Sequence, residues 1–151
     1  MKPKIILGTD HAGFSLKEAI KDFLIKEGYE VEDVGTHKLD PKDDYPDFIS
    51  KAAKKVSSDK NSLGIILGGS GQGEAITANK VKGIRAALYY GKNMDIVKLS
   101  RKHNDANILS LGARFLTKNE AITAVKTWLA TGFSKEKRHV RRIKKISDLE
   151  K

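Results

Sequence analysis

The chain has 151 residues, a formal net charge of +10 and no cysteine. This length suits one domain with a buried core, and the lack of cysteine excludes disulfide bonds, thiolate zinc sites and a cysteine nucleophile. No apolar run approaches the roughly 20 residues of a membrane-spanning helix, and the first residues turn polar too soon for a secretory signal. We therefore expect a cytoplasmic protein without a membrane partner, whose positive charge suits nucleic acid or phosphorylated small molecules.

Short apolar segments alternate with helical patterns along the chain. Strands are predicted at residues 4–9, 30–34, 63–67, 84–89 and 107–111. Helices are predicted before Gly28, at residues 46–56, after a glycine-rich loop, and at residues 92–101 and 118–130. In the first helix, Lys17 and Lys21 are predicted to face solvent.

This alternation predicts a three-layer, Rossmann-like α/β fold, with a five-stranded parallel sheet and helices on both faces. An extra basic amphipathic helix is predicted at residues 134–149, with Val140, Ile143, Ile146 and Leu149 in one apolar stripe. The whole chain, residues 1–151, is interpreted as a single domain.

The glycine-rich loop joins the third predicted strand to a helix and reads Gly68-Gly69-Ser70-Gly71-Gln72-Gly73-Glu74. A strand, a glycine turn and a helix N-terminus together make a cradle of N–H groups for an anion or an oxyanion. Glu74 stands where a Walker loop needs lysine and where the dinucleotide fingerprint needs its third glycine. The loop is therefore not expected to hold nucleotide phosphates.

Glu74 is the first candidate for chemistry. It lies in the first turn of a helix, where the macrodipole favours the charged carboxylate. A carboxylate beside N–H donors suits removal of a proton from a carbon next to a carbonyl. The alternative is an acid that only stabilises the helix, but the four adjacent glycines favour the catalytic interpretation.

Further candidates lie where other predicted strands end. Ligands of parallel sheets bind at the carboxyl ends of strands, and Asp10, His11 and Arg114 all follow such ends. Asp10 suits sugar hydroxyls and His11 suits a phosphate. An ordinary turn with an N-cap is an equal alternative for this pair.

Further candidates come from other parts of the chain. His103 and Asn104 follow a predicted helix, whose C-terminus favours a protonated imidazole that can donate to a ring oxygen. A simple C-cap pair is the alternative. Arg138 and Arg142 are four residues apart and suit one phosphate, with His139 beside them, although a solvated basic face is the simpler interpretation. No histidine pair has the spacing of a helical zinc site, so no metal is predicted.

These residues together resemble the type B ribose-5-phosphate isomerases of the ribose/galactose isomerase family. The matching segments keep their order over nearly the whole chain: Asp10-His11-Ala12-Gly13, Asp44-Tyr45-Pro46, Gly68 to Glu74, Ala78-Asn79-Lys80, His103-Asn104, Gly112-Ala113-Arg114 and Arg138 to Arg142. One branch of the family has a cysteine at the position of Gly68. Since this chain has none, it resembles the branch that uses a glutamate.

The resemblance implies interconversion of D-ribose 5-phosphate and D-ribulose 5-phosphate through an enediolate, without metal or organic cofactor. It implies that Glu74 is the base, that His103 opens the sugar ring and that Asp10 holds hydroxyls. The implied substrate-binding residues are His11, Gly69, Ser70, Gly71, Gln72, Gly73, Asn104, Arg114, Arg138 and Arg142. The resemblance also implies a homodimer or dimer of dimers, in which the positions of His103, Asn104 and Arg114 reach the neighbouring subunit's site.

Other functions are open alternatives. Relatives in the family act on other sugar phosphates, such as galactose 6-phosphate or allose 6-phosphate, and a sugar-phosphate sensor without catalysis would use the same scaffold. A nucleic-acid-binding module would explain the charge. However, only 7% of the residues are aromatic, and no stacking or helix-turn-helix signature appears, so no nucleic acid partner is expected.

Overall fold

A five-stranded, wholly parallel sheet forms the middle layer of the protein, in the strand order β2-β1-β3-β5-β4. The computed structural model describes all residues, 1–151. Its strands are β1 (Lys4–Thr9), β2 (Val31–Asp33), β3 (Ser62–Gly68), β4 (Ala86–Tyr89) and β5 (Ile108–Gly112). The predicted fold class is therefore confirmed.

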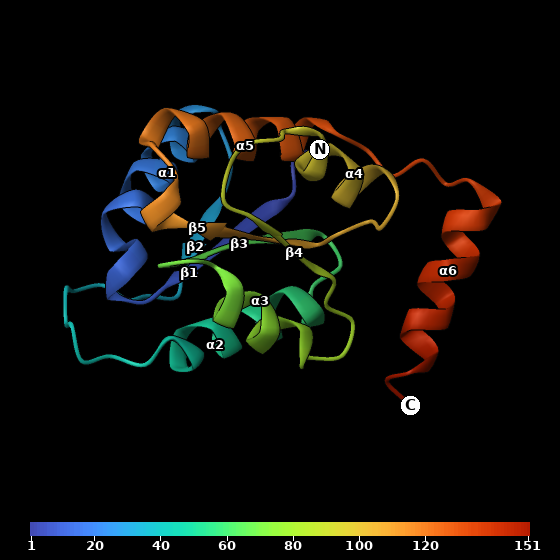
Figure 1. Ribbon diagram of the computed structural model, residues 1–151, viewed down its shortest axis with the longest axis horizontal. Coiled ribbons are helices and arrows are strands. Elements are labelled where there is room, and N and C mark those ends of the chain that lie inside the picture. Colours follow the sequence, from blue (N-terminus) through green and yellow to red (C-terminus); the bar gives the residue numbers. More distant parts are fainter.

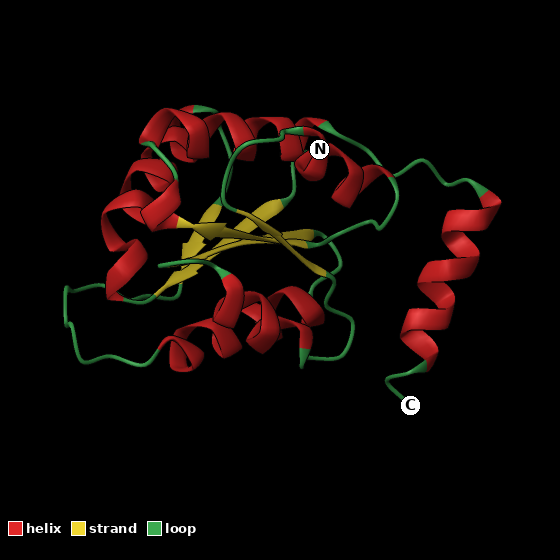
Figure 2. Cartoon of the chain, in the orientation of Figure 1, coloured by secondary structure: helices red, strands yellow, loops and turns green.

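Helices cover both faces of the sheet (Figures 1 and 2). One face carries α1 (Phe14–Lys26), α4 (Asp95–Lys102) and α5 (Lys118–Ala130), and the other carries α2 (Tyr45–Ser58) and α3 (Gln72–Asn79). Two short 3-10 turns, η1 (His11–Gly13) and η2 (Ala113–Phe115), follow β1 and β5, and α6 (Lys137–Asp148) stands beside the layers. None of these helices has the length and apolar character that crossing a membrane requires.

The core consists of two apolar clusters, one on each face of the sheet. Successive residues of a strand point to opposite faces. Ile65 and Leu67 of β3 therefore pack in the cluster around Trp128, and Ile66 packs in the other. A strand buried on both faces reads as a continuous apolar run, which is why the sequence predicts the central strands well. Each fully buried side chain of this size contributes about 1.5–3 kcal/mol.

The predicted ends of several elements are wrong by a few residues. β2 and β4 are shorter than predicted, and α4 begins at Asp95 rather than at residue 92. Lys92 has a φ of 79°, a left-handed conformation that an α-helix does not accommodate. α6 begins at Lys137 rather than at residue 134, because the Ser134 hydroxyl accepts the N–H of Glu136 and the backbone of Glu136 is extended.

Lys17 is buried, which contradicts the prediction that it faces solvent. Its side chain is fully inaccessible, and its Nζ donates to Asp33 Oδ2 at 2.6 Å and to the Thr36 carbonyl at 2.7 Å. Lys21 reaches the same carboxylate at 3.2 Å from a more exposed position. These bonds attach α1 to the end of β2 and to the loop that follows it.

We predict that Lys17→Met destabilises the protein far more than Lys21→Met. Removing one partner of a buried ion pair leaves an uncompensated charge and costs roughly 3–5 kcal/mol. The remaining bonds of Asp33 place Lys17→Met at the lower end, about 3 kcal/mol, whereas the exposed pair is worth about 1 kcal/mol or less. Urea denaturation of both variants measures this difference, and equal losses would show that burial of Lys17 carries no special weight.

Candidate active site

Three central strands end at one edge of the sheet, and the loops after them carry most of the predicted site. β1, β3 and β5 lie side by side, with β3 in the middle. Asp10 and His11 follow β1, the segment from Gly69 to Glu74 follows β3, and Arg114 follows β5. The Arg114 N–H donates to the Gly69 carbonyl at 3.0 Å, which joins two of these loops. The strand ends that carry these candidates therefore lie at the same edge of the sheet.

The glycine-rich loop is held against β5 by its backbone. Gly71, the N-cap of α3, has a φ of 78°, and its carbonyl accepts the hydroxyl of Ser110 at 2.7 Å. A Cβ at this position would lie 2.9 Å from the backbone of Leu111. Both the left-handed conformation and the close approach require glycine here. The first N–H groups of α3, which have no partner within a helix, are thereby fixed at the edge of the sheet.

Gly68 and Glu74 share one small space at the end of β3. A Cβ added to Gly68 would overlap the carboxyl group of Glu74. The carboxyl group therefore occupies the place that any side chain at position 68 would need. Glycine at position 68 is therefore what allows the Glu74 carboxyl group to lie there.

The carboxyl group of Glu74 is buried rather than exposed. The residue is 4% accessible, and its pKa is raised by burial first and then by the nearby negative charge of Asp10. Interactions with the backbone of Glu74 and Gly71 act in the opposite direction. The expectation that the helix N-terminus would favour the charged form is thus outweighed by loss of solvent.

Another first-turn glutamate shows what a merely helix-stabilising acid looks like. Glu120 of α5 is exposed, accepts the backbone N–H of Thr117 at 2.9 Å and completes a capping box with it. These bonds lower the pKa of Glu120. Glu74 has the opposite burial and the opposite pKa shift, so the helix-stabilising interpretation does not describe it.

His11 is hydrogen-bonded to Asp43, a residue that the sequence did not single out, and Asp10 lies beside the pair. Asp10 is buried, and its Oδ1 caps η1 by accepting the Ala12 N–H at 3.0 Å. His11 Nδ1 lies 2.6 Å from Asp43 Oδ1 and 3.9 Å from Asp10 Oδ2. Although these three side chains could group around an ion, the 2.6 Å separation is that of a direct hydrogen bond.

Two further side chains cover the glycine-rich loop. The guanidinium of Arg114 lies over Gly69, where its Nη1 would be 3.0 Å from an added Cβ. The resemblance implied that Arg114 reaches a neighbouring subunit's site, and this stays a prediction. The hydroxyl of Tyr45, at the start of α2, occupies the space beside Gly73. Tyr45 belongs to a segment that carries the resemblance, but no role was predicted for it.

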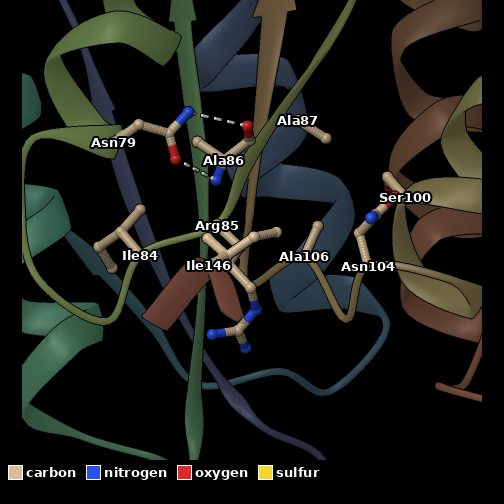
Figure 3. A pocket seen from close by; sticks show the side chains of 9 residues that line it. All are labelled: Asn79, Ile84, Arg85, Ala86, Ala87, Ser100, Asn104, Ala106 and Ile146. Atoms are coloured by element: carbon tan, nitrogen blue, oxygen red, sulfur yellow. Dashed lines mark hydrogen bonds between the residues drawn. The ribbon is translucent and has the colours of Figure 1, made fainter. Parts of the chain in front are cut away.

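The remaining candidates are not brought to this edge of the sheet. His103 is the C-cap of α4, and β5 begins only at Ile108, so His103 and Asn104 lie at the amino-terminal edge. The five residues of β5 separate the two edges by about 15 Å, at roughly 3.3 Å per residue. Asn104 and Ile146 of α6 line a pocket of about 340 Å³ there (Figure 3).

His139 is buried against His103 instead of facing solvent beside the arginines. Its ring centroid lies 4.2 Å from that of His103, and its Nδ1 lies 2.7 Å from the Ser134 hydroxyl. Burial, followed by the charge of His103, lowers the pKa of His139. Arg138 and Arg142 are exposed, and Arg138 Nε pairs with Glu136 at 3.0 Å. One chain therefore holds two groups of predicted site residues at opposite edges.

The chain is similar over nearly its whole length to known proteins. The family model described as Ribose/Galactose Isomerase matches residues 5–146. Ribose-5-phosphate isomerase B of Mycolicibacterium paratuberculosis is 43% identical over 98% of this chain and 92% of that protein. The structure of ribose-5-phosphate isomerase B from Clostridium thermocellum is 48% identical, with a TM-score of 0.92 and 97% of each chain covered.

A second solved relative carries a ligand. Ribose-5-phosphate isomerase B from Mycoplasma genitalium, solved with bound ribulose-5-phosphate, is 40% identical with a TM-score of 0.93. The alignment covers 97% of this chain and 95% of that one. With the match of the family model over most of its length, the chain belongs to the ribose/galactose isomerase family.

Proposed function

We propose that this protein interconverts D-ribose 5-phosphate and D-ribulose 5-phosphate, with Glu74 as the base. The observation that carries the proposal is the position of the Glu74 carboxyl group. It is buried against Gly68, and it is hydrogen-bonded by the backbone of Gly71 and Glu74 at the start of α3. A base and a set of oxyanion donors are thereby fixed on one element.

In the proposed reaction, ionised Glu74 removes the proton from C2 of the open-chain aldose. The electron pair of that C–H bond forms the C1–C2 double bond of an enediolate, and the carbonyl oxygen takes up negative charge. The N–H groups of the loop from Ser70 to Gly73 stabilise this charge. The Glu74 acid returns its proton to C1, and the remaining hydroxyl proton moves from O2 to O1 to give the ketose. A raised pKa suits a group that must both take and return a proton.

The same edge provides cations for the phosphate group of the substrate. The pKa of His11 is raised, first by its hydrogen bond to Asp43, which favours the imidazolium. Arg114 adds a permanent positive charge beside Gly69. A bound sugar phosphate then spans from the Glu74 carboxyl group to these cations. The ribulose-5-phosphate held by the Mycoplasma genitalium relative supports this class of ligand.

The second group of residues belongs, in this proposal, to the site of a partner copy. His103 would open the sugar ring, and Asn104, Arg138 and Arg142 would bind the substrate across a dimer interface. The apolar stripe of α6 supports such an interface: Val140, Ile146 and Leu149 are 48%, 44% and 84% exposed in the single chain. Burial of apolar side chains is the main driving force for the association of subunits.

We predict that Glu74→Gln abolishes turnover while substrate binding is largely retained. Glutamine fills the same space but cannot accept the C2 proton, and loss of a general base costs roughly 100- to 10,000-fold in kcat. Formation of ketose from ribose 5-phosphate measures the loss. A fully active variant would remove Glu74 from the mechanism.

The preference among sugar phosphates is measured with the wild-type protein. Ribose 5-phosphate, galactose 6-phosphate and allose 6-phosphate are assayed side by side, and the pentose phosphate is expected to have the highest kcat/KM. Deuterium from solvent is expected to enter the position next to the carbonyl. Binding of ribose 5-phosphate without any deuterium uptake would identify a sensor instead of an enzyme.

We predict that Asp10→Asn moves the acid limb of the kcat/KM profile to lower pH. Activity requires ionised Glu74 and is lost as pH falls through its pKa, which lies above the ordinary 4.5. Removing the charge of Asp10 favours ionisation of Glu74, because Asp10 raises its pKa. The variant is also expected to have a lower kcat from lost hydroxyl contacts, so the position of the limb is the measurement. An unmoved limb would contradict the electrostatic coupling.

We predict that two inactive variants restore activity when they share a dimer. Glu74→Gln and His103→Asn would each disable every site of a homodimer. A mixed dimer has one site with both substitutions and one with neither. Random mixing should therefore recover about a quarter of the wild-type activity, because half of the dimers are mixed and each has one intact site. Recovery is measured after the two variants are unfolded and refolded together, and its absence would show that each chain builds its own site.

A further inference from the structure

Asp43 lies in the loop between β2 and α2 and is almost fully buried. Its side chain is 9% accessible. One oxygen, Oδ1, accepts the His11 backbone N–H at 3.2 Å and lies 2.6 Å from His11 Nδ1. The other oxygen, Oδ2, is buried and has no hydrogen-bond partner. A buried carboxylate with one unsatisfied oxygen is costly, so its place beside His11 calls for a functional reason.

The contact between Asp43 and His11 determines which ring nitrogen of His11 can bind a ligand. With Nδ1 bonded to a carboxylate, Nε2 is the ring nitrogen that remains for a substrate. A carboxylate at 2.6 Å is also the partner that most favours the imidazolium, since charge-assisted hydrogen bonds are the strong ones. The bond to the backbone N–H of His11 fixes the carboxylate at the same time.

Two other charged groups shift the pKa of His11, in opposite directions. Asp10 Oδ2, at 3.9 Å, favours the charged ring. Arg114, across the site, disfavours it. Asp43 has the larger effect of the two carboxylates on the ring. The pKa of His11 is therefore raised although a second cation, Arg114, stands near it.

The loop that carries Asp43 is built into the fold. Lys17 Nζ donates to the Thr36 carbonyl at 2.7 Å, and the Thr36 N–H donates to the Thr9 carbonyl of β1 at 2.7 Å. Thr36, near the start of this loop, is thus fixed beside the end of β1. His11 follows the same end of β1. The contact between Asp43 and His11 joins the other end of the loop to that edge.

We propose that Asp43 is a positioning residue that holds His11 protonated, with Nε2 free to bind the phosphate of the substrate. The binding part of this role rests on the proposed function. The state of the His11 ring does not, and it can be measured on the protein without any substrate.

The test compares Asp43→Asn with a matched control, Asp44→Asn. Asparagine keeps the size of Asp43 and an acceptor for the His11 N–H, but it removes the negative charge. Asp44 is the next residue, is exposed and makes no side-chain bond at the start of α2. We expect Asp43→Asn to raise KM for ribose 5-phosphate about tenfold with kcat changed less than about threefold, because phosphate binding is equal in ground and transition states. The control should leave both near the wild-type values.

The titration of His11, followed by NMR in the free protein, separates positioning from a general structural effect. In the wild type, His11 is expected to titrate above the 6.5 of an ordinary histidine, with its proton kept on Nδ1. In Asp43→Asn the midpoint should fall, while in Asp44→Asn it should stay. A wild-type midpoint at or below 6.5 would overturn the proposal even if the variant failed to fold. So would an unchanged midpoint in a folded Asp43→Asn protein.

Failure of the proposed function and failure of the proposal on Asp43 give different results. If the protein does not isomerise ribose 5-phosphate but the His11 midpoint responds to Asp43, the proposed function fails and the positioning of His11 stands. If the protein is active and the double variant His11→Gln with Asp43→Asn has a much higher KM than His11→Gln alone, Asp43 acts other than through His11 and the proposal is wrong.

Discussion

The close contact between the Glu74 carboxyl group and the backbone at Gly68 is the constraint on which the site depends. A carboxylate at an exposed helix N-terminus is stabilised in its charged form and makes a weak base. Here the end of β3 closes over the group, and loss of solvent raises its pKa. The missing Cβ of Gly68 is what makes this burial sterically feasible. The backbone atoms that end β3 therefore also desolvate the carboxyl group that we propose as the base.

The parallel topology explains why one chain places its two groups of predicted site residues at opposite edges of the sheet. Every crossover in a parallel sheet returns the chain to the amino-terminal edge. His103 lies on such a return segment, whereas Glu74 lies where the chain leaves a strand. No side chain is long enough to join positions separated by the length of β5. A site that needs both groups must therefore be completed by a second molecule, which is the physical basis for the shared sites proposed above.

Much of the fold follows from local patterns, while several functional contacts do not. Continuous apolar runs identify the central strands, and glycine spacing identifies the loop. Lys17 was misplaced because helical periodicity cannot reveal that Asp33, on another element, captures its ammonium. Asp43 was missed because a polar loop has no periodicity, and its partner His11 is 32 positions away. The burial of His139 arises from a stack between two separate elements. Each missed feature depends on a tertiary contact between charged or aromatic groups distant in sequence.

The positions of the charged side chains around Glu74 bear on its proposed role as a base. A phosphate group requires cations, yet a cation beside Glu74 would lower its pKa and weaken it as a base. The charged side chain that raises the Glu74 pKa is the acid Asp10. His11 receives its own carboxylate in Asp43, so part of its charge is neutralised locally. Under the proposed mechanism, the fold thereby binds a dianionic group and keeps a proton-accepting carboxylate in the same site, because His11 is paired with Asp43 rather than with Glu74.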